Sequence, residues 1–213
     1  MVKSIDVKHG QTKHKGTNKI VLLIVLLVGC VLALFYFKSQ GSLVPVNEQQ
    51  AGPITPKTAF DETALLNVLG KDFRLNYGMR MNKDELVSFY LATSLAKPEY
   101  QLTINSQQKG RIDAVEITHP AWQTQEGGVG SAFSDIYSAS FDYCRATEKE
   151  HEDRLTLLCQ SPHYPNVRYV FEGHWQGDET LLPDNETLAP WKMVKLIWFA
   201  DVPHDQFSRE IGR

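Results

Sequence analysis

Cys144 and Cys159 are the residue pair whose chemistry is easiest to predict. They flank a charged stretch, residues 148–154, that is typical of a solvated hairpin tip. In an oxidising compartment such a pair predicts a disulfide across the base of the hairpin. The alternative is a pair of metal thiolates with His151 between them, but zinc sites usually separate their cysteines by about two to four residues. The spacing favours the disulfide, which would stabilise the fold by about 3 kcal/mol in the chain-entropy model.

Other polar residues are weaker candidates for chemistry. Asp113 and Glu116 could act as paired carboxylates, although acids at this spacing along one strand usually face solvent. Ser131, Ser134 and Ser138 lack the Gly-x-Ser-x-Gly motif of a nucleophile elbow. The histidines show no spacing typical of metal ligands; they include His119, His151, His163, His174 and His204. The sequence therefore predicts no enzyme, and no catalytic, metal-binding or cofactor-binding residue.

Three glycines, Gly127, Gly128 and Gly130, precede a predicted short helix in which Phe133 and Ile136 share a face. Glycines before a helix can hold a phosphate. The Walker motif, however, needs Lys-Ser or Lys-Thr after its last glycine, and this stretch has neither. The glycines therefore predict a tight turn into a packed helix.

Aromatic residues of the last third of the chain are the main indication of binding. They comprise Tyr169, Phe171, Trp175, Trp191 and Trp198. This set could fill a core, or it could leave a concave face against which a ligand or a partner stacks. Trp122 lies in a predicted loop and is the best candidate for an exposed binding aromatic. The candidate contacts for a partner or ligand are Trp122, Trp175 and Trp191.

An uncharged apolar run at residues 20–37 predicts a membrane anchor. As a helix, the run would rise about 27 Å, close to the roughly 30 Å thickness of the hydrocarbon core. The basic leader before it, residues 1–19, contains five lysines. Since positive charge stays on the cytoplasmic side, the C-terminal part is predicted to lie across the membrane.

Cys30 allows a second interpretation of the same run. Residues 27–30, Leu-Val-Gly-Cys, resemble the bacterial lipobox, in which the signal peptide is cut before a cysteine that is then lipidated. Cleavage there would leave the apolar residues 31–37 on the mature protein. The sequence thus leaves two alternatives, an uncleaved inner-membrane span and a lipoprotein modified at Cys30. Both tether the domain to a membrane.

Residues 39–213 are acidic, with 16 Lys and Arg against 24 Asp and Glu and a formal net charge of −8. Nucleic acid and anionic lipid headgroups would repel such a domain at low salt. Nucleic acid is therefore excluded as a partner, and contact with the membrane is expected through the N-terminal anchor.

The hydrophobic pattern predicts one domain at residues 52–200, after a Gly- and Pro-containing linker at 38–51 and before a polar tail at 201–213. A helix is predicted to begin at Thr58 and to end at Gly70. Alternation of apolar and polar residues predicts strands at residues 73–81, 87–92 and 169–175. Residues 100–104 and 111–117 are predicted to form a further pair of strands. Residues 193–199 are apolar on both faces apart from Lys195, which predicts a strand covered on both sides. We expect an α+β fold, with a largely antiparallel sheet of about seven to eight strands, two short helices and one N-terminal membrane-anchoring helix.

Several stretches match a known pattern together, although each is weak alone. They are Arg74-Leu75, residues 133–138, Cys144 with Cys159, residues 169–177, Trp191-Lys192 and residues 195–198. In these the chain resembles the RpoE-regulated lipoprotein family, a domain of unknown function from Gram-negative bacteria. The resemblance implies a lipoprotein that faces the periplasm, is made under envelope stress, has an α+β fold and has no assigned catalytic residues. The long basic leader and the C-terminal tail depart from the family pattern.

Three hypotheses on function follow. The first is a membrane-tethered periplasmic protein that contacts another envelope component without catalysis, and an exposed apolar patch on a filled sheet would favour it. The alternative is a binder of a small apolar or lipidic ligand in a pocket bordered by aromatic residues. The third is an enzyme that uses Asp113 and Glu116, which would require ionisable groups converging in a cleft.

Overall fold

The structure is a computed structural model that describes residues 43–82, 85–107, 110–138, 143–147, 153–178 and 181–202. The basic leader, the apolar run at 20–37, Cys30 and residues 203–213 of the predicted tail lie outside the described residues. Within the described ranges, no helix combines the length and the apolar character needed to cross a membrane.

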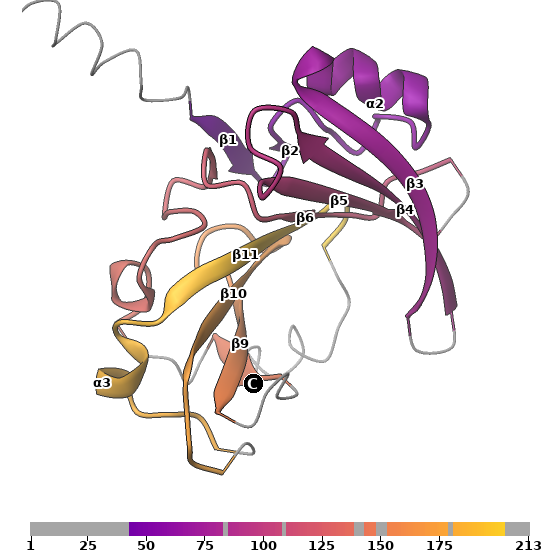
Figure 1. The fold of residues 1–213 in the computed structure, drawn as a ribbon. Helices are drawn as coiled ribbons and strands as arrows, with labels where there is room; N and C mark the ends of the chain where they lie inside the picture. Colours follow the sequence, from indigo (N-terminus) through magenta and orange to yellow (C-terminus); the bar gives the residue numbers. More distant parts are fainter. Residues whose placement is uncertain are drawn as a thin grey trace, which may run out of the picture. The chain divides into compact units, whose positions relative to one another are not determined.

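An antiparallel sheet of eight strands dominates the domain (Figure 1). Its spatial order is β3-β4-β5-β6-β11-β10-β9-β8. In chain order the strands are β3 (Phe73–Asn82), β4 (Glu85–Ser94), β5 (Gln101–Ser106), β6 (Ala114–Ile117), β8 (Cys144–Ala146), β9 (Arg154–Gln160), β10 (Val167–His174) and β11 (Lys192–Phe199). Every neighbouring pair is antiparallel. The predicted antiparallel sheet with short helices is confirmed.

The helices are short and lie outside the sheet. The α-helices are α2 (Glu62–Leu69) and α3 (Asn185–Leu188), and the 3-10 helices are η1 (Gly70–Asp72) and η2 (Phe133–Asp135). Asp61, not Thr58, caps α2, because its carboxylate accepts a hydrogen bond from Ala64 N at 2.9 Å. The Thr58 hydroxyl instead accepts from Thr55 N at 3.0 Å in the preceding turn. The predicted helix start is therefore three residues early.

A second, small sheet contradicts the predicted linker in the part that the structure describes, residues 43–51. It consists of β1 (Val44–Asn47), β2 (Gln50–Ala51) and β7 (Trp122–Gln123) in the order β2-β1-β7. The indole of Trp198 donates to Asn47 O at 2.9 Å, and Asn166 Nδ2 donates to Glu48 O at 2.9 Å. These bonds join β1 and the turn after it to β11 and to the loop before β10. The folded domain thus begins at Leu43, about nine residues earlier than predicted.

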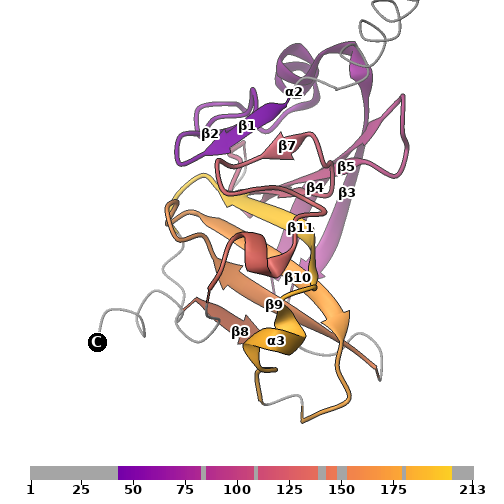
Figure 2. The same ribbon diagram turned by 90° about the vertical axis from the view of Figure 1, so that its left-hand side faces the viewer.

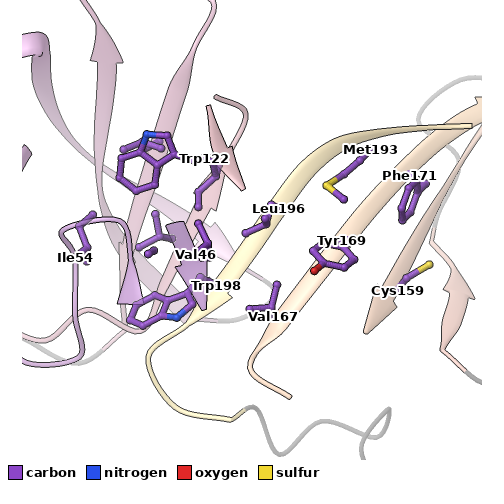
Figure 3. Packing of buried hydrophobic residues seen from close by; sticks show 14 of the residues in the cluster. Val46, Ile54, Trp122, Cys159, Val167, Tyr169, Phe171, Met193, Leu196 and Trp198 are labelled. Carbon is purple, nitrogen blue, oxygen red and sulfur yellow. The ribbon is translucent and has the colours of Figure 1, made fainter. Parts of the chain in front are cut away.

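The core lies on one face of the large sheet, between it and the small sheet, α2, η2 and α3 (Figure 2). Figure 3 shows part of this buried cluster, including Val46, Trp122, Tyr169 and Trp198. Alternate residues of the central strands point into it. They include Leu102, Ile104, Val115, Ile117, Tyr169, Phe171, Leu196 and Trp198, each fully buried. The apolar residues of the alternating sequence pattern are therefore the ones whose side chains face the core.

The predicted disulfide between Cys144 and Cys159 is present. The two cysteines face each other directly in the β8–β9 pair, and both are buried. Strand β8 has three residues and lies at the end of the sheet, so the bridge fixes this short strand to its neighbour. The hairpin inferred from the spacing of the cysteines is therefore correct.

Candidate functional site

A cleft of about 420 Å³ opens on the face of the large sheet opposite the core. We call it the open-face cleft. Its apolar lining consists of Val87 of β4, Ala114 of β6, Ile197 and Phe199 of β11, and Val202. Its polar rim includes Arg80 from β3 and Glu116 from β6. Asp113, the other member of the candidate acid pair, also lines it. The two acids predicted as a possible pair thus face the same space.

Glu116 is the centre of a network of charged and polar groups. Its Oε1 accepts from Arg80 Nη2 at 2.5 Å and from Asn105 Nδ2 at 2.9 Å. Its Oε2 accepts from Lys195 Nζ at 2.9 Å. Arg80 Nη2 also donates to Asn105 Oδ1 at 3.1 Å. The Glu116 side chain is 18% exposed, whereas those of Arg80 and Lys195 are 44% and 37% exposed.

The electrostatics of this network fix Glu116 in its charged form. Burial alone would raise the pKa of Glu116, but the charges and hydrogen bonds of Lys195 and Arg80 outweigh it and hold the pKa below its ordinary value. A carboxylate in this state is a poor proton donor and a weak base at neutral pH. The geometry therefore does not favour acid–base catalysis by Glu116.

The Arg80–Glu116 contact also indicates how the cleft forms. Strands β3 and β6 are three steps apart in the sheet, roughly 14 Å if the sheet were flat. The sheet must therefore curl toward its open face for the two side chains to meet. Arg80 lies 5.7 Å from the ring centroid of Phe89, and a Cβ at Gly78 would lie 2.5 Å from that ring. Only glycine at position 78 leaves room for the outer edge of the Phe89 ring against β3.

A second carboxylate, Glu126, is buried at the other side of the domain. Its side chain accepts hydrogen bonds from the hydroxyls of Ser161, at 2.8 Å, and Tyr169, and from His163 N at 3.0 Å. Burial, together with the hydrogen bond to Glu126, raises the pKa of Tyr169, so that its hydroxyl stays protonated and donates. These bonds fix the loop before β10 to the turn at residues 124–127.

This cluster contains a serine, a histidine and an acid, but it is not arranged for nucleophilic catalysis. Ser161 and the His163 ring both bond to Glu126, whereas a catalytic triad needs the histidine between the serine and the acid. The Ser161 hydroxyl is thus oriented by a carboxylate and has no general base of the triad type. The same turn holds Gly127 with a positive φ of 149°, as the predicted tight turn requires.

The hairpin of β3 and β4 has an exposed apolar surface on the core side. Tyr77, Met79 and Met81 of β3 and Leu86 of β4 are 57, 58, 64 and 58% exposed. We call these four residues the hairpin patch. The first part of the same face is covered, since the Phe60 and Tyr90 rings lie 5.0 Å apart and Tyr77 lies 5.3 Å from Tyr90. Beyond Tyr77, the described residues leave the apolar face of the hairpin open.

Most of the candidate aromatic contacts are core residues instead. Trp122 is buried in β7, with only 3% exposure, so the prediction of an exposed loop aromatic is wrong. Trp191 is also buried, against Gly173, where a Cβ would lie 2.2 Å from the indole. Trp175 is partly buried, and its indole donates to Asp178 O at 3.1 Å. Of the two alternatives for the aromatic set, the core is the one found.

The sequence missed the residues that form the two exposed sites. Arg80, Asn105 and Lys195 come from three strands, and no short spacing connects them. The alternation of residues 73–81 predicts an apolar strand face that includes Met79 and Met81, but it does not predict that the two side chains are exposed. In the described part of the chain, no group of three or more His, Cys, Asp or Glu side chains is placed to hold a metal ion.

The chain is similar to a protein family and to a bacterial protein that are both described as uncharacterized. Residues 32–200 match a family described as "Protein of unknown function (DUF1131)". "Uncharacterized protein YfeY" of Escherichia coli (strain K12) is 33% identical over 162 residues, which cover 74% of this chain and 81% of that protein. The crystal structure of yfeY from Escherichia coli has a TM-score of 0.59 at 28% identity and covers 74% of this chain and 99% of that one. These matches agree with the predicted resemblance to a Gram-negative family of unknown function.

Proposed function

The chain belongs to the DUF1131 family of proteins of unknown function, and from this premise we propose that it is a non-enzymatic interaction protein of the bacterial envelope. In this proposal the β3–β4 hairpin docks a partner protein through the hairpin patch. The observation that carries the proposal is the exposure of Tyr77, Met79, Met81 and Leu86 side by side. Contiguous exposed apolar side chains on a soluble domain mark sites of interaction.

The shape and chemistry of the hairpin suit a protein partner. Met79 and Met81 are flexible and polarisable side chains that adapt to partners of different shape. Strand β3 lies at the end of the sheet, so that in the described residues one of its edges has no strand partner. An extended segment of another protein can add to such an edge by main-chain hydrogen bonds while its side chains cover the apolar face. Strand β3, which has ten residues, can therefore offer a partner both main-chain hydrogen bonds at its edge and apolar side-chain contacts on its face.

Net charge argues for a protein and against the bilayer as the occupant of the patch. Residues 39–213 carry a formal net charge of −8, which anionic lipid headgroups repel at low salt. A basic or neutral partner protein meets no such barrier. The proposed binding surface is therefore a protein-docking site, and the contact with the membrane is assigned to the N-terminal anchor.

We further propose that the domain works in the periplasm, close to a membrane, as part of the response to envelope stress. The Cys144–Cys159 disulfide supports an oxidising compartment. If residues 20–37 span the membrane, five residues separate the span from Leu43, and they reach at most about 18 Å. If Cys30 is lipidated, twelve residues separate it from Leu43 and reach at most about 43 Å. The two anchors therefore differ in how far the hairpin patch can be presented from the bilayer.

The other two hypotheses have less support. A ligand site bordered by tryptophan and tyrosine would need the rings of Tyr169, Trp191 and Trp198, and these fill the core. Catalysis by Asp113 and Glu116 would need one carboxyl of raised pKa, whereas the pKa of Glu116 is lowered. The open-face cleft is a different kind of site, lined by apolar side chains such as Ile197 and Phe199 and by charged ones such as Arg80 and Glu116.

Affinity purification of the full-length protein from its own envelope tests the proposal. A Met79→Ser, Met81→Ser double variant should lose a specific co-purifying envelope protein that the wild type retains. Leu181→Ser is the matched control, since Leu181 is 61% exposed and lies outside the patch. Retention of the same partner by the double variant, or equal loss in the control, would contradict docking at the hairpin patch.

A further inference from the structure

The open-face cleft has a lining of apolar and acidic side chains that the proposed protein contact does not use. We propose that it binds a small organic amine, with one ammonium group on a compact apolar body. The ammonium group lies at the end of the cleft that holds Asp113 and Asp201, and the body lies on the apolar lining. The cleft is on the face opposite the hairpin patch, so this site does not depend on the proposed protein contact.

The charge of the lining gives the sign of the ligand. Among the described residues that line the cleft, Arg80 is the one cation, and it faces the carboxylates of Asp113, Glu116 and Asp201. Lys195 and Arg111 contact two of these carboxylates from outside the lining, in partly exposed pairs that are weak. A carboxylate has about four acceptor sites, so one that already has a partner can accept a further hydrogen bond. An ammonium group, with three donors and no acceptor, therefore matches this lining, whereas an anion would meet like charge.

Strand pairing places the acids of the lining at opposite ends of the cleft. Glu116 pairs with Ile197, and two residues further along both strands Ala114 pairs with Phe199. The two aspartates lie beyond that second row, one before β6 and one after β11. In the part of the chain that the structure describes, no three acidic, histidine or cysteine side chains converge on a point where a metal ion would sit. Acids that are separated by an apolar row suit an organic cation better than a bare metal ion, which needs converging oxygen ligands.

The apolar lining and the size of the cleft give the rest of the ligand. The apolar side chains are those of Val87, Ala114, Ile197, Phe199 and Val202. An alkyl or aryl group that lies on them loses its contact with water, which stabilises the complex, whereas a hydrated inorganic cation gains nothing from them. A cavity of about 420 Å³ is near the lower end of the range for small-molecule sites. An apolar lining of this size with an acidic end therefore describes a small organic amine.

Isothermal titration calorimetry with 2-phenylethylamine, which is protonated at neutral pH, tests the proposal. The full-length protein is placed in nanodiscs of zwitterionic lipid, and empty nanodiscs provide the background. Saturable binding of one amine per chain is expected. Phenylethanol, which has the same body and no charge, and methylamine, which has the charge and no such body, should each bind at least about tenfold more weakly. Phenylpropanoate, which has the opposite charge, should not bind. The methylamide of acetyl-lysine presents the ammonium group as a protein would, and it should bind more weakly than 2-phenylethylamine.

Two variants and one control locate the site. An Asp113→Asn, Asp201→Asn double variant should weaken binding of 2-phenylethylamine by at least about tenfold. A Glu48→Gln, Glu99→Gln double variant changes the net charge equally at exposed positions outside the cleft, and this matched control should bind as the wild type does. Ala114→Phe fills the apolar lining while keeping the carboxylates, so it should abolish binding and tests the cleft even if the aspartate variant is poorly folded. Absence of saturable binding, equal binding of phenylethanol, methylamine or phenylpropanoate, stronger binding of the lysine derivative, or full binding by either cleft variant would overturn the proposal.

Discussion

Reduction of the Cys144–Cys159 disulfide is expected to lower the free energy of unfolding by about 3 kcal/mol. The bond closes a loop with a sequence separation of 15 residues, and the chain-entropy model assigns about 3 kcal/mol to a loop of that length. In a domain of about 150 to 250 residues, 1 kcal/mol corresponds to about 2–4 °C in melting temperature. The melting temperature should therefore fall by about 6–12 °C. Strand β8 should lose order first, because it has one neighbour in the sheet and three residues.

Thermal unfolding followed by circular dichroism, with and without reductant, measures this shift. Cys30→Ser is the background of choice, because the sequence has three cysteines and this variant leaves only the bridged pair to respond. Alkylation of the denatured variant should find no thiol before reduction and two afterwards. Two free thiols before reduction would refute the bridge. An unchanged melting temperature after complete reduction would refute the assignment of its stabilising role.

Two further substitutions test the open-face cleft and the core. Glu116→Gln should cost about 1–2 kcal/mol at neutral pH, since its two cationic partners are partly exposed and screened. Because the folded pKa of Glu116 is lowered, the advantage of the wild type is present above about pH 4.3 and declines as the pH falls further. Urea unfolding at a series of pH values should show the two proteins converging in acid, and a constant difference would contradict the network. Gly173→Ala would place a Cβ 2.2 Å from the Trp191 indole and should cost about 1–3 kcal/mol by overpacking; unchanged urea unfolding would contradict this packing.

The strands with strict alternation were predictable because one face of each lies on the core. Residues 73–81 and 169–175 were predicted within a few residues of β3 and β10 for this reason. The pair of cysteines was predictable because an antiparallel hairpin brings its two ends together. In these parts of the chain, the local sequence pattern is sufficient to predict the structure that is found.

The first strands were missed because their stability comes from distant residues. Residues 44–51 contain Pro45 and several polar side chains and lie between Gly41 and Gly52, which is the composition of a linker. They form strands because β7, Trp198 and Asn166 supply hydrogen bonds from more than 70 positions away in the chain. Trp122 was assigned to an exposed loop for the same reason, as its burial depends on pairing with Val44. A parallel pair between such distant segments leaves no local signal.

The hairpin patch and the open-face cleft could not be predicted from the sequence, although some of their residues belong to predicted strands. The alternation of residues 73–81 predicts an apolar face, but the exposure of its far end depends on where the covering contacts, such as that of Phe60 with Tyr90, stop. Asp113 and Glu116 were considered as a pair on their spacing alone. The state of Glu116 is instead determined by Arg80 and Lys195, which reach it from strands β3 and β11 through the curl of the sheet. Both the exposure of the hairpin and the charged state of Glu116 depend on the order of the strands in the sheet. The sequence pattern does not give that order.

Photo-crosslinking in living cells is the most direct test of the central claim, that the hairpin patch docks a partner protein. A photoreactive phenylalanine analogue is placed at Met79 in one strain and at Leu181 in another, two positions of similar exposure. A discrete crosslinked product of constant mass is expected from Met79, and none of that mass from Leu181. The same product from both positions, or no protein adduct from Met79 in any growth condition including envelope stress, would contradict it.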